Sequence, residues 1–398
     1  MSKKDIYILM NKNDEVLSFY VDFKKSRAFF IQKLEHFDKA PYGINKNDGE
    51  IDTMLNSFFN SRAIPFQRNG YKNILKATHC RNGFVLSFKG HGLSLSNHFW
   101  YKKVGEKLRY EDINFFTNKW DDSFAKAVIA EDYETLVHVD LNVPDIVTAG
   151  WGVKGWLYDE KKGPRLYKLG INKDSPDEVL GEVLASRLAQ RLFPKEEVLQ
   201  YDLEKINGKY ASVSSPMIGV DEELITLSNY LPYDFYRLYR ERRLNKVAVE
   251  TFMNKLKENG HSELYDFFIK LTCLKSLCFV NDMHFENISI VKNMITGEIK
   301  MAPLYDLGGA FGSGSKAKEF LAHPNKTMFL LIYFLYSNLD PQWDYSWYDK
   351  DKLIGFEDEI REVLSKSEFY TPDLIDLIID VYQKQKSSLN EMASKKQK

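Results

Sequence analysis

The feature that most constrains this chain is the loop Asn-Asp-Met-His-Phe-Glu-Asn at 281–287, followed after a short apolar segment by a second acidic element, Tyr-Asp-Leu-Gly at 305–308. Phosphoryl transfer needs a carboxylate near the attacking hydroxyl and oxygen ligands that hold Mg²⁺ on the nucleotide phosphates. Asp282, Asn287 and Asp306 can supply these groups. Such residues are also ordinary turn formers, but the agreement of two separate elements favours the catalytic interpretation.

Regular structure is predicted on both sides of this loop. Upstream, apolar residues recur at i, i+3, i+4 and i+7 from about Ser262, which predicts a helix with one buried face. Downstream, the β-rich runs 288–291 and 298–301 flank a turn and predict a hairpin. A hairpin places Asn287 and Asp306 at neighbouring ends of two paired strands, where one metal ion can bridge them.

A glycine-containing turn at 148–156 is the candidate for covering the nucleotide phosphates. Gly150 and Gly152 let backbone amides approach phosphate oxygens closely, and Lys154 adds a positive charge beside them. The strand that starts there turns back into a second strand, on which Lys168 can point under the loop at the α- and β-phosphates. The alternative is an ordinary hairpin without a ligand.

The loop resembles that of the bacterial HipA-like serine/threonine kinases, which combine Asn-Asp-x-His-x-x-Asn with a following Pro-Leu-Tyr-Asp-Leu. This resemblance implies that Asp282 is the catalytic base, that Asn287 and Asp306 hold Mg²⁺ on ATP, and that His284 steadies the loop or touches the γ-phosphate. The family usually carries Lys before the loop Asn, whereas this chain has Glu286. The short motif also resembles phosphatidylinositol kinases, so it predicts kinase chemistry more sharply than it predicts the substrate.

Further site residues follow from the kinase interpretation. Glu182 occupies the place of the helix glutamate that pairs with the strand lysine, here Lys168. Glu178 is the competing candidate, but the sequence places it in a capping box at the helix start. The break after the next strand is the expected linker between two kinase lobes, where the backbone at Met217 and Ile218 contacts adenine.

Composition limits the partners of the chain. The 398 residues include 44% hydrophobic residues, enough for a substantial core. The 55 basic and 56 acidic side chains leave a net charge of −1, so no bulk field favours nucleic acid or an anionic membrane. Three cysteines are too few for a disulfide framework or a zinc site, and no stretch approaches a signal peptide or a membrane span. A cytoplasmic protein is expected.

The resemblance, which is clearest over 145–310, implies an α+β, two-lobed protein kinase-like (HipA-like) fold. The expected domains are an N-terminal mixed α/β subdomain at 1–140, a kinase N-lobe at 141–220 and a mainly helical C-lobe at 221–398. The implied activity is ATP- and Mg²⁺-dependent phosphorylation of a protein serine or threonine, by a toxin or effector kinase with a separately encoded small antitoxin-like regulator. A small-molecule or lipid kinase and a non-catalytic kinase-fold module are the alternatives.

The remaining segments carry simpler predictions. The run 6–23 predicts a hairpin and 83–88 a further strand, both in the N-terminal subdomain. Helices are expected near 319–337, 352–365 and 372–392. In HipA-like kinases a serine of the phosphate-covering loop is a regulatory site. This chain has Val147 at the matching place and Thr148 next to it, so autophosphorylation of Thr148 is predicted, with an unmodified turn threonine as the alternative.

Overall fold

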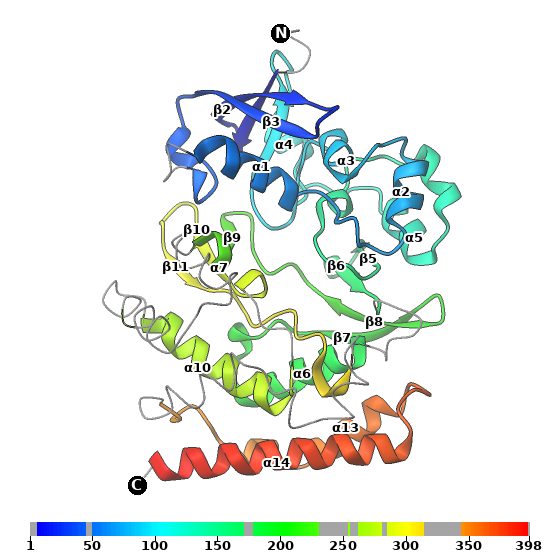
Figure 1. The fold of residues 1–398 in the computed structure, drawn as a ribbon, viewed down its shortest axis with the longest axis vertical. Coiled ribbons are helices and arrows are strands. Elements are labelled where there is room, and N and C mark those ends of the chain that lie inside the picture. The colour runs from blue at the N-terminus through cyan, green and yellow to red at the C-terminus, as the bar shows by residue number, and fades with distance from the viewer. Residues whose placement is uncertain are drawn as a thin grey trace. The chain divides into compact units, whose positions relative to one another are not determined.

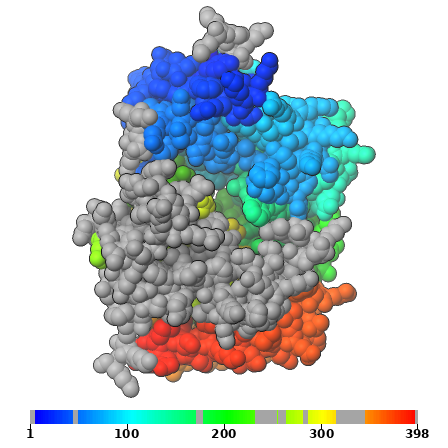
Figure 2. Space-filling view, in the orientation of Figure 1, coloured from blue at the N-terminus to red at the C-terminus, as the bar shows by residue number. Residues whose placement is uncertain are grey.

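The computed structural model describes residues 6–44, 50–170, 178–230, 254, 262–280, 285–313 and 344–396, which are coloured in Figure 2. The chain forms two compact units of mixed α and β structure, as the α+β prediction requires. Unit 1 comprises Met1–Lys168, Ser215–Ile225 and Lys292–Glu298. Unit 2 comprises Leu169–Ser214, Thr226–Val291 and Ile299–Lys398. The domain boundaries expected from the sequence, at 140/141 and 220/221, stay predictions.

Unit 1 starts with a four-stranded antiparallel sheet of order β3-β2-β1-β4. Its strands are β1 (Ile6–Asn11), β2 (Asp14–Asp22), β3 (Arg27–Lys33) and β4 (Phe99–Lys103). The predicted hairpin over 6–23 is confirmed, with Leu9 opposite Leu17 and a bulge immediately after Leu9. Apolar side chains pack on both faces of this sheet: Ile8, Met10 and Trp100 belong to one core cluster, and Tyr7, Leu9 and Phe19 belong to a second cluster on the opposite face.

Short helices cover the face of the second cluster, and Figure 1 shows α1 and α3 beside the sheet. The helices of unit 1 are α1 (Ile51–Ser61), α2 (Tyr71–Ala77), α3 (Gly83–Lys89), α4 (Tyr110–Ile113) and α5 (Ser123–Ala130), with 3-10 turns η2 (Phe37–Lys39), η5 (Tyr133–His138) and η6 (Pro144–Val147). Aromatic rings hold helices and sheet together: the Phe88 and Tyr101 centroids lie 4.3 Å apart, and those of Phe19 and Phe59 lie 4.8 Å apart. Such pairs stabilise the core beyond the area they bury.

The strand predicted at 83–88 is wrong, because this segment is helix α3. The Asn82 side chain accepts a hydrogen bond of 3.0 Å from the Val85 amide, which is an N-cap. Phe84 and Phe88, one helical turn apart, both pack into the aromatic core. The β-prone residue types therefore follow the helical period, and the Asn cap was the signal that sequence reasoning missed.

The predicted hairpin after the glycine-containing turn is confirmed as β5 (Lys154–Asp159) and β6 (Gly163–Lys168). Helix α5 packs closely on β5, since a Cβ added at Gly155 would lie 2.8 Å from the Cβ of Ala125. Gly155 therefore permits the approach of helix and strand, which fixes the hairpin to the N-terminal subdomain.

Unit 2 is mainly helical. Its long helices are α6 (Glu178–Leu192), α10 (Ser262–Leu277), α13 (Phe356–Leu364) and α14 (Pro372–Lys396). The shorter elements within or bordering unit 2 are η7 (Lys195–Glu197), β7 (Asp202–Ile206), β8 (Lys209–Ser214), β9 (Glu222–Thr226), α7 (Leu227–Tyr230), η8 (Phe285–Asn287), β10 (Ser289–Asn293), β11 (Ile299–Met301), η9 (Ala310–Gly312) and η11 (Lys350–Leu353). The predicted helix at 262 and the hairpin after the acidic loop are confirmed, as are the helices near 352–365 and 372–392. The predicted helix at 319–337 and the predicted helix start before Glu178 lie outside the described residues.

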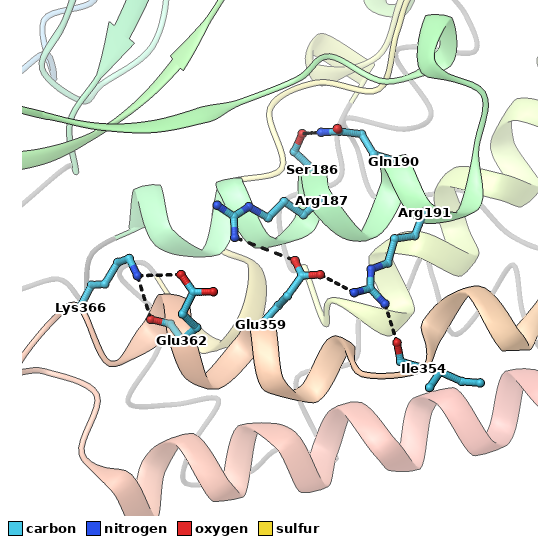
Figure 3. Close-up of polar contacts among 8 residues, drawn as sticks. All are labelled: Ser186, Arg187, Gln190, Arg191, Ile354, Glu359, Glu362 and Lys366. Carbon is cyan, nitrogen blue, oxygen red and sulfur yellow. Dashed lines mark hydrogen bonds and ion pairs between the residues drawn. The ribbon is translucent and has the colours of Figure 1, made fainter.

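Helices α6 and α13 are joined by arginine contacts that Figure 3 shows. Arg191 donates to the Glu359 carboxylate and, at 2.8 Å, to the Ile354 carbonyl. Arg187 lies 3.9 Å from the same carboxylate. These contacts fix α6 on the helical part of unit 2, and α6 carries the two glutamates considered below.

Two further predictions concern cysteines and membranes. Cys80, Cys273 and Cys278 are all buried and free of disulfides. Within the described ranges, no helix combines the length and the apolar character needed to cross a bilayer.

Candidate functional site

The predicted base Asp282 and the adjacent His284 lie outside the described residues. The structure describes both flanks of their loop. Before it, the Cys278 carbonyl at the end of α10 accepts a hydrogen bond of 2.9 Å from the Phe311 amide. After it, η8 ends at Asn287. The end of α10 is therefore attached to the chain segment that follows Asp306.

Tyr305 joins the two segments that carry the predicted metal ligands. Its hydroxyl donates to the Glu286 carbonyl at 3.0 Å and lies 2.7 Å from the Ser289 hydroxyl. Glu286 and Ser289 flank Asn287, and Tyr305 directly precedes Asp306. Burial raises the pKa of Tyr305 well above its ordinary value, so the phenol stays protonated and able to donate. The two ligand-bearing segments are therefore fixed to each other by hydrogen bonds.

Asp306 itself adopts a left-handed backbone conformation, with φ of 51°. Its amide donates to the Tyr201 hydroxyl at 3.2 Å. Two residues earlier, Leu304 exchanges hydrogen bonds with the chain after α6, donating to the Glu197 carbonyl at 2.7 Å and accepting from the Leu199 amide at 3.0 Å. Aspartate tolerates this conformation better than most residues, and the surrounding bonds hold it there.

Helix α6 packs tightly on the segment after Asp306. A Cβ on Gly181 would collide with the Ala310 carbonyl and the Ser313 hydroxyl, so only glycine permits this approach. A Cβ on Gly308 would lie 2.9 Å from a carboxylate oxygen of Glu178. The carboxylate of Glu178 therefore lies beside Gly308, two residues beyond Asp306.

Glu182 lies one helical turn after Glu178 and is only 2% exposed. Its carboxylate accepts a hydrogen bond of 2.6 Å from the Ser212 hydroxyl on β8. Burial and this bond fix the carboxylate on the side of α6 that packs against β8, whereas Glu178 lies beside the acidic segment. The pairing of Glu182 with Lys168 stays a prediction.

The predicted metal ligands suit Mg²⁺ by their chemistry. Asn287 and Asp306 offer an amide oxygen and a carboxylate oxygen, the hard donors that this ion prefers. Among the described residues there is no group of three or more histidine, cysteine, aspartate or glutamate side chains placed to hold a metal. Mg²⁺ commonly binds to one or two protein oxygens, with substrate phosphates and water completing its shell. The donor set fits an ion that arrives with a nucleotide.

Two lysines, Lys154 and Lys168, lie on one face of the hairpin that follows the glycine-containing turn. Gly150 has φ of +95°, and a Cβ there would overlap the ammonium group of Lys154. Lys154 and Lys168 are direct partners across β5 and β6, so their side chains leave the same face of the hairpin. The turn that contains Gly150 and Gly152 therefore lies next to a strand pair that carries two positive charges on one face. The assignment of Gly150, Gly152, Lys154 and Lys168 to the nucleotide phosphates stays a prediction.

Arg68 holds this turn and was not predicted from the sequence. Arg68 is 4% exposed, and its guanidinium donates to the Gly150 carbonyl at 2.7 Å and also to the Thr148 carbonyl. The next amide, of Asn69, donates to the Trp151 carbonyl at 3.0 Å. Burial lowers the pKa of Arg68 to about 10, so it remains charged at neutral pH. A lone arginine in a turn has no periodic signal by which it could have been found.

Asp145, which precedes the same turn in the sequence, has a buried carboxyl. Asp145 is 3% exposed, and one of its oxygens accepts from the Trp156 amide at 2.8 Å. Its other oxygen has no hydrogen-bond partner in the described structure. Burial raises the pKa of Asp145 to about 7, against the opposing effects of the Trp156 amide and Arg68.

Unit 1 also contains the predicted residues Thr148, Met217 and Ile218, and the buried His98, for which no role is predicted. The Thr148 hydroxyl donates to the Pro144 carbonyl at 2.9 Å, so it is engaged. Strand β8 ends at Ser214, and the chain continues without regular structure past the half-buried Met217 and the buried Ile218. His98 lies 2.6 Å from the Tyr110 hydroxyl, and burial lowers its pKa to about 4, so it is neutral at physiological pH.

Among the comparisons with known proteins, only solved structures match this chain, and they indicate its fold. No family model matches the chain, and no curated protein matches its sequence. The solved complex of HipA with HipB and operator DNA, a toxin-antitoxin system of Shewanella oneidensis MR-1, matches with a TM-score of 0.51 and 12% identity, covering 98% of this chain and 99% of the HipA chain. A proinflammatory kinase of Helicobacter pylori, CtkA, matches with a TM-score of 0.40 and 14% identity over 61% of this chain and 90% of its own. The chain has the two-lobed fold of the HipA-like kinases.

Proposed function

We propose that this protein is an ATP- and Mg²⁺-dependent serine/threonine protein kinase of the HipA-like type. The observation that carries the proposal is the Tyr305 bridge, which holds Asn287 and Asp306 on adjoining segments within a HipA-like kinase fold. Mg·ATP supplies the γ-phosphoryl group. Asp282 orients the substrate hydroxyl and takes its proton, while Asn287 and Asp306 hold the metal ion.

The nucleotide contacts follow from the elements already described. The backbone around Gly150 and Gly152 covers the phosphates, and Lys154 and Lys168 neutralise them. Glu182, fixed by Ser212, orients Lys168. The backbone at Met217 and Ile218 contacts adenine, and His284 steadies the catalytic loop. In this scheme the protein contributes mainly position and charge, which is what phosphoryl transfer requires.

The proposal extends to the setting of the reaction. The HipA of the matching structure forms a complex with HipB and operator DNA. We extend this to a separately encoded, small antitoxin-like regulator for the present chain, acting as a cytoplasmic toxin or effector kinase with a protein substrate. The net charge of −1 gives this chain no bulk attraction to DNA, so any nucleic-acid contact is assigned to the regulator.

Radioactive labelling tests the proposal. A cell lysate incubated with [γ-³²P]ATP and the wild-type protein should show a labelled protein that is absent with Asp282→Ala. Asp380→Ala, an exposed carboxylate on α14, is the matched control and should label as the wild type does. Label only in a small molecule or lipid would replace the protein kinase assignment with another kinase. Equal labelling by wild type and Asp282→Ala would refute the assigned base.

A further inference from the structure

A pocket lies within unit 1 and shares no residue with the proposed nucleotide site. It has a volume of about 420 Å³, within the usual range for small-molecule sites. Its walls come from the β1–β2 turn, the chain at 38–42, strand β9 and the turn after β10. All four segments belong to one compact unit, so the pocket is a feature of that unit alone.

Most charges at this pocket are already paired with each other. Lys12 forms an ion pair of 2.9 Å with Asp221, and Lys39 forms one of 2.7 Å with Asp14. The Met294 amide donates to the Asp221 carbonyl at 2.8 Å, which attaches the turn after β10 to the wall. These bonds build the pocket and leave its rim close to electrically neutral.

Two opposite charges in the lining are not paired in this way. Glu223 is 8% exposed, yet within the described part of the chain its carboxylate has neither a hydrogen bond nor an ion pair. The ammonium group of Lys292, which also lines the pocket, has none either among those residues. Burial raises the pKa of Glu223 to about 7, and the positive charges of Lys292 and Arg62 oppose this rise. The Glu223 carboxylate and the Lys292 ammonium are farther apart than the 4.0 Å of an ion pair. Buried charges are rarely left so, because their desolvation is costly.

We propose that this pocket binds a small zwitterion of the α-amino acid class. The ligand's ammonium group would donate to Glu223 and its carboxylate would accept from Lys292, so both lining charges gain a partner at once. Ile225 and Met294 give apolar surface for a side chain. A simple anion would pair Lys292 but face the Glu223 carboxylate, and a simple cation would meet the reverse repulsion. The dipolar ligand alone satisfies both groups.

Calorimetric titration of the full-length protein tests this proposal with matched ligands. Alanine and leucine carry both charges, while propylamine and propionate each carry one. The amino acids are expected to bind with dissociation constants below about 10 mM, and the singly charged compounds at least about tenfold more weakly. Binding of propionate or propylamine as tight as that of the amino acids would refute the zwitterion, and so would no binding by any common amino acid.

Variants then assign the binding to this pocket. Glu223→Gln and Lys292→Gln should each weaken amino acid binding by about tenfold or more, because each removes one charge partner. Lys107→Gln, an exposed lysine away from the pocket, is the control and should bind as the wild type does. Circular dichroism checks that each variant is folded. Should Glu223→Gln fail to fold, the half-buried Lys292 decides the matter, and unchanged binding by Lys292→Gln would overturn the proposal.

Discussion

A single phenol, Tyr305, connects the two segments that carry the proposed metal ligands. Its hydroxyl donates a hydrogen bond to the backbone of one segment, and it directly precedes Asp306 in the other segment. The Asp306 amide donates a hydrogen bond to the Tyr201 hydroxyl. The backbone of Asp306 is thereby held in its left-handed conformation. If Asp306 is the metal ligand that we propose, a fixed backbone preorganises it before the nucleotide arrives.

Alanine substitutions at Asp306 and at Asp282 should impair the proposed kinase in different ways. Asp306→Ala removes a proposed metal ligand and should weaken Mg·ATP binding by about tenfold or more, whereas Asp282→Ala should leave ATP affinity nearly unchanged. Both should lower turnover by about 10²-fold or more. Calorimetric titration with Mg·ATP separates the variants, and Asp380→Ala is the control. An equal loss of ATP binding in both would contradict the division of roles.

Asp145 should make stability depend on pH. The pKa of this carboxyl rises from its ordinary 3.8 to about 7 in the folded protein. Between these values the unfolded chain releases the proton that the folded chain keeps, so this group lowers the free energy of unfolding as pH rises, with the full loss above about 7. Arg68 and the Trp156 amide oppose the shift, and Asp122 adds to it.

Asp145→Asn keeps an oxygen acceptor for the Trp156 amide but cannot ionise. Its melting temperature relative to the wild type should therefore be higher at pH 8 than at pH 5. Thermal unfolding of both proteins at the two pH values measures this difference. If the melting temperatures of variant and wild type differ by the same amount at pH 5 and pH 8, Asp145 is not a buried acid with a raised pKa.

At the scale of elements, the hairpins followed directly from local sequence. The pairs β1–β2, β5–β6 and β10–β11 combine β-rich runs with turn residues, and this local signal suffices to place them. Helix α3 was misread because its aromatic residues favour strands in isolation, while tertiary packing and the Asn82 cap favour a helix. Arg68 was missed because its partners lie about eighty positions away, beyond the reach of any local pattern.

The Arg68 contacts should position the phosphate-covering turn. Arg68→Ala removes the bonds to the Thr148 and Gly150 carbonyls and should raise the KM for ATP by about tenfold, with a smaller effect on kcat. Amide hydrogen exchange at 148–152 should become faster, which reports the turn independently of activity. Arg68→Lys should be less impaired than Arg68→Ala in both measurements, because an ammonium can replace one of the two carbonyl contacts.

Arg81→Ala is the matched control for this prediction. Arg81 is exposed and also donates to a backbone carbonyl, that of Lys24, but it lies away from the turn. Its removal should leave both the KM for ATP and the exchange at 148–152 unchanged. Unaltered exchange in Arg68→Ala would show that the turn is held without the arginine.

Lys168 and Glu182 belong to different elements, β6 and α6, and are proposed to act as one pair. Lys168→Met and Glu182→Ala should each raise the ATP requirement and lower turnover. Residues that act as a unit give losses that are far from additive, so the double variant should be little worse than either single one. A double-mutant cycle on kcat/KM measures this, and additive losses would favour Glu178, beside Gly308, as the partner of the lysine.

At the scale of the whole molecule, the sequence predicted the kinase-like fold from two short motifs, and the HipA-like architecture is confirmed. The N-terminal subdomain was predicted only as mixed structure, because its aromatic core joins residues such as Phe19, Phe59 and Tyr101 that are distant in sequence. Arg68 belongs to unit 1 and donates hydrogen bonds to the Gly150 and Thr148 carbonyls of the turn proposed to cover the phosphates. We therefore expect regulation of this turn to involve residues of unit 1.

Autophosphorylation of Thr148 is the predicted form of that regulation. The Thr148 hydroxyl donates to the Pro144 carbonyl, and its own carbonyl accepts from Arg68. A phosphate removes the donor and adds a charge of about −1.5 to −2 where ATP phosphates are proposed to lie, so repulsion should drive the turn away and switch the enzyme off.

Intact-mass and peptide mass spectrometry after incubation with Mg·ATP should find one phosphate at Thr148, together with falling activity. Thr148→Val keeps the side-chain shape without the hydroxyl and should remain active over the same incubation. Thr135→Val, an exposed threonine of unit 1, is the control and should lose activity as the wild type does. An active preparation with no phosphate between Val143 and Lys154 would leave Thr148 an unmodified turn residue.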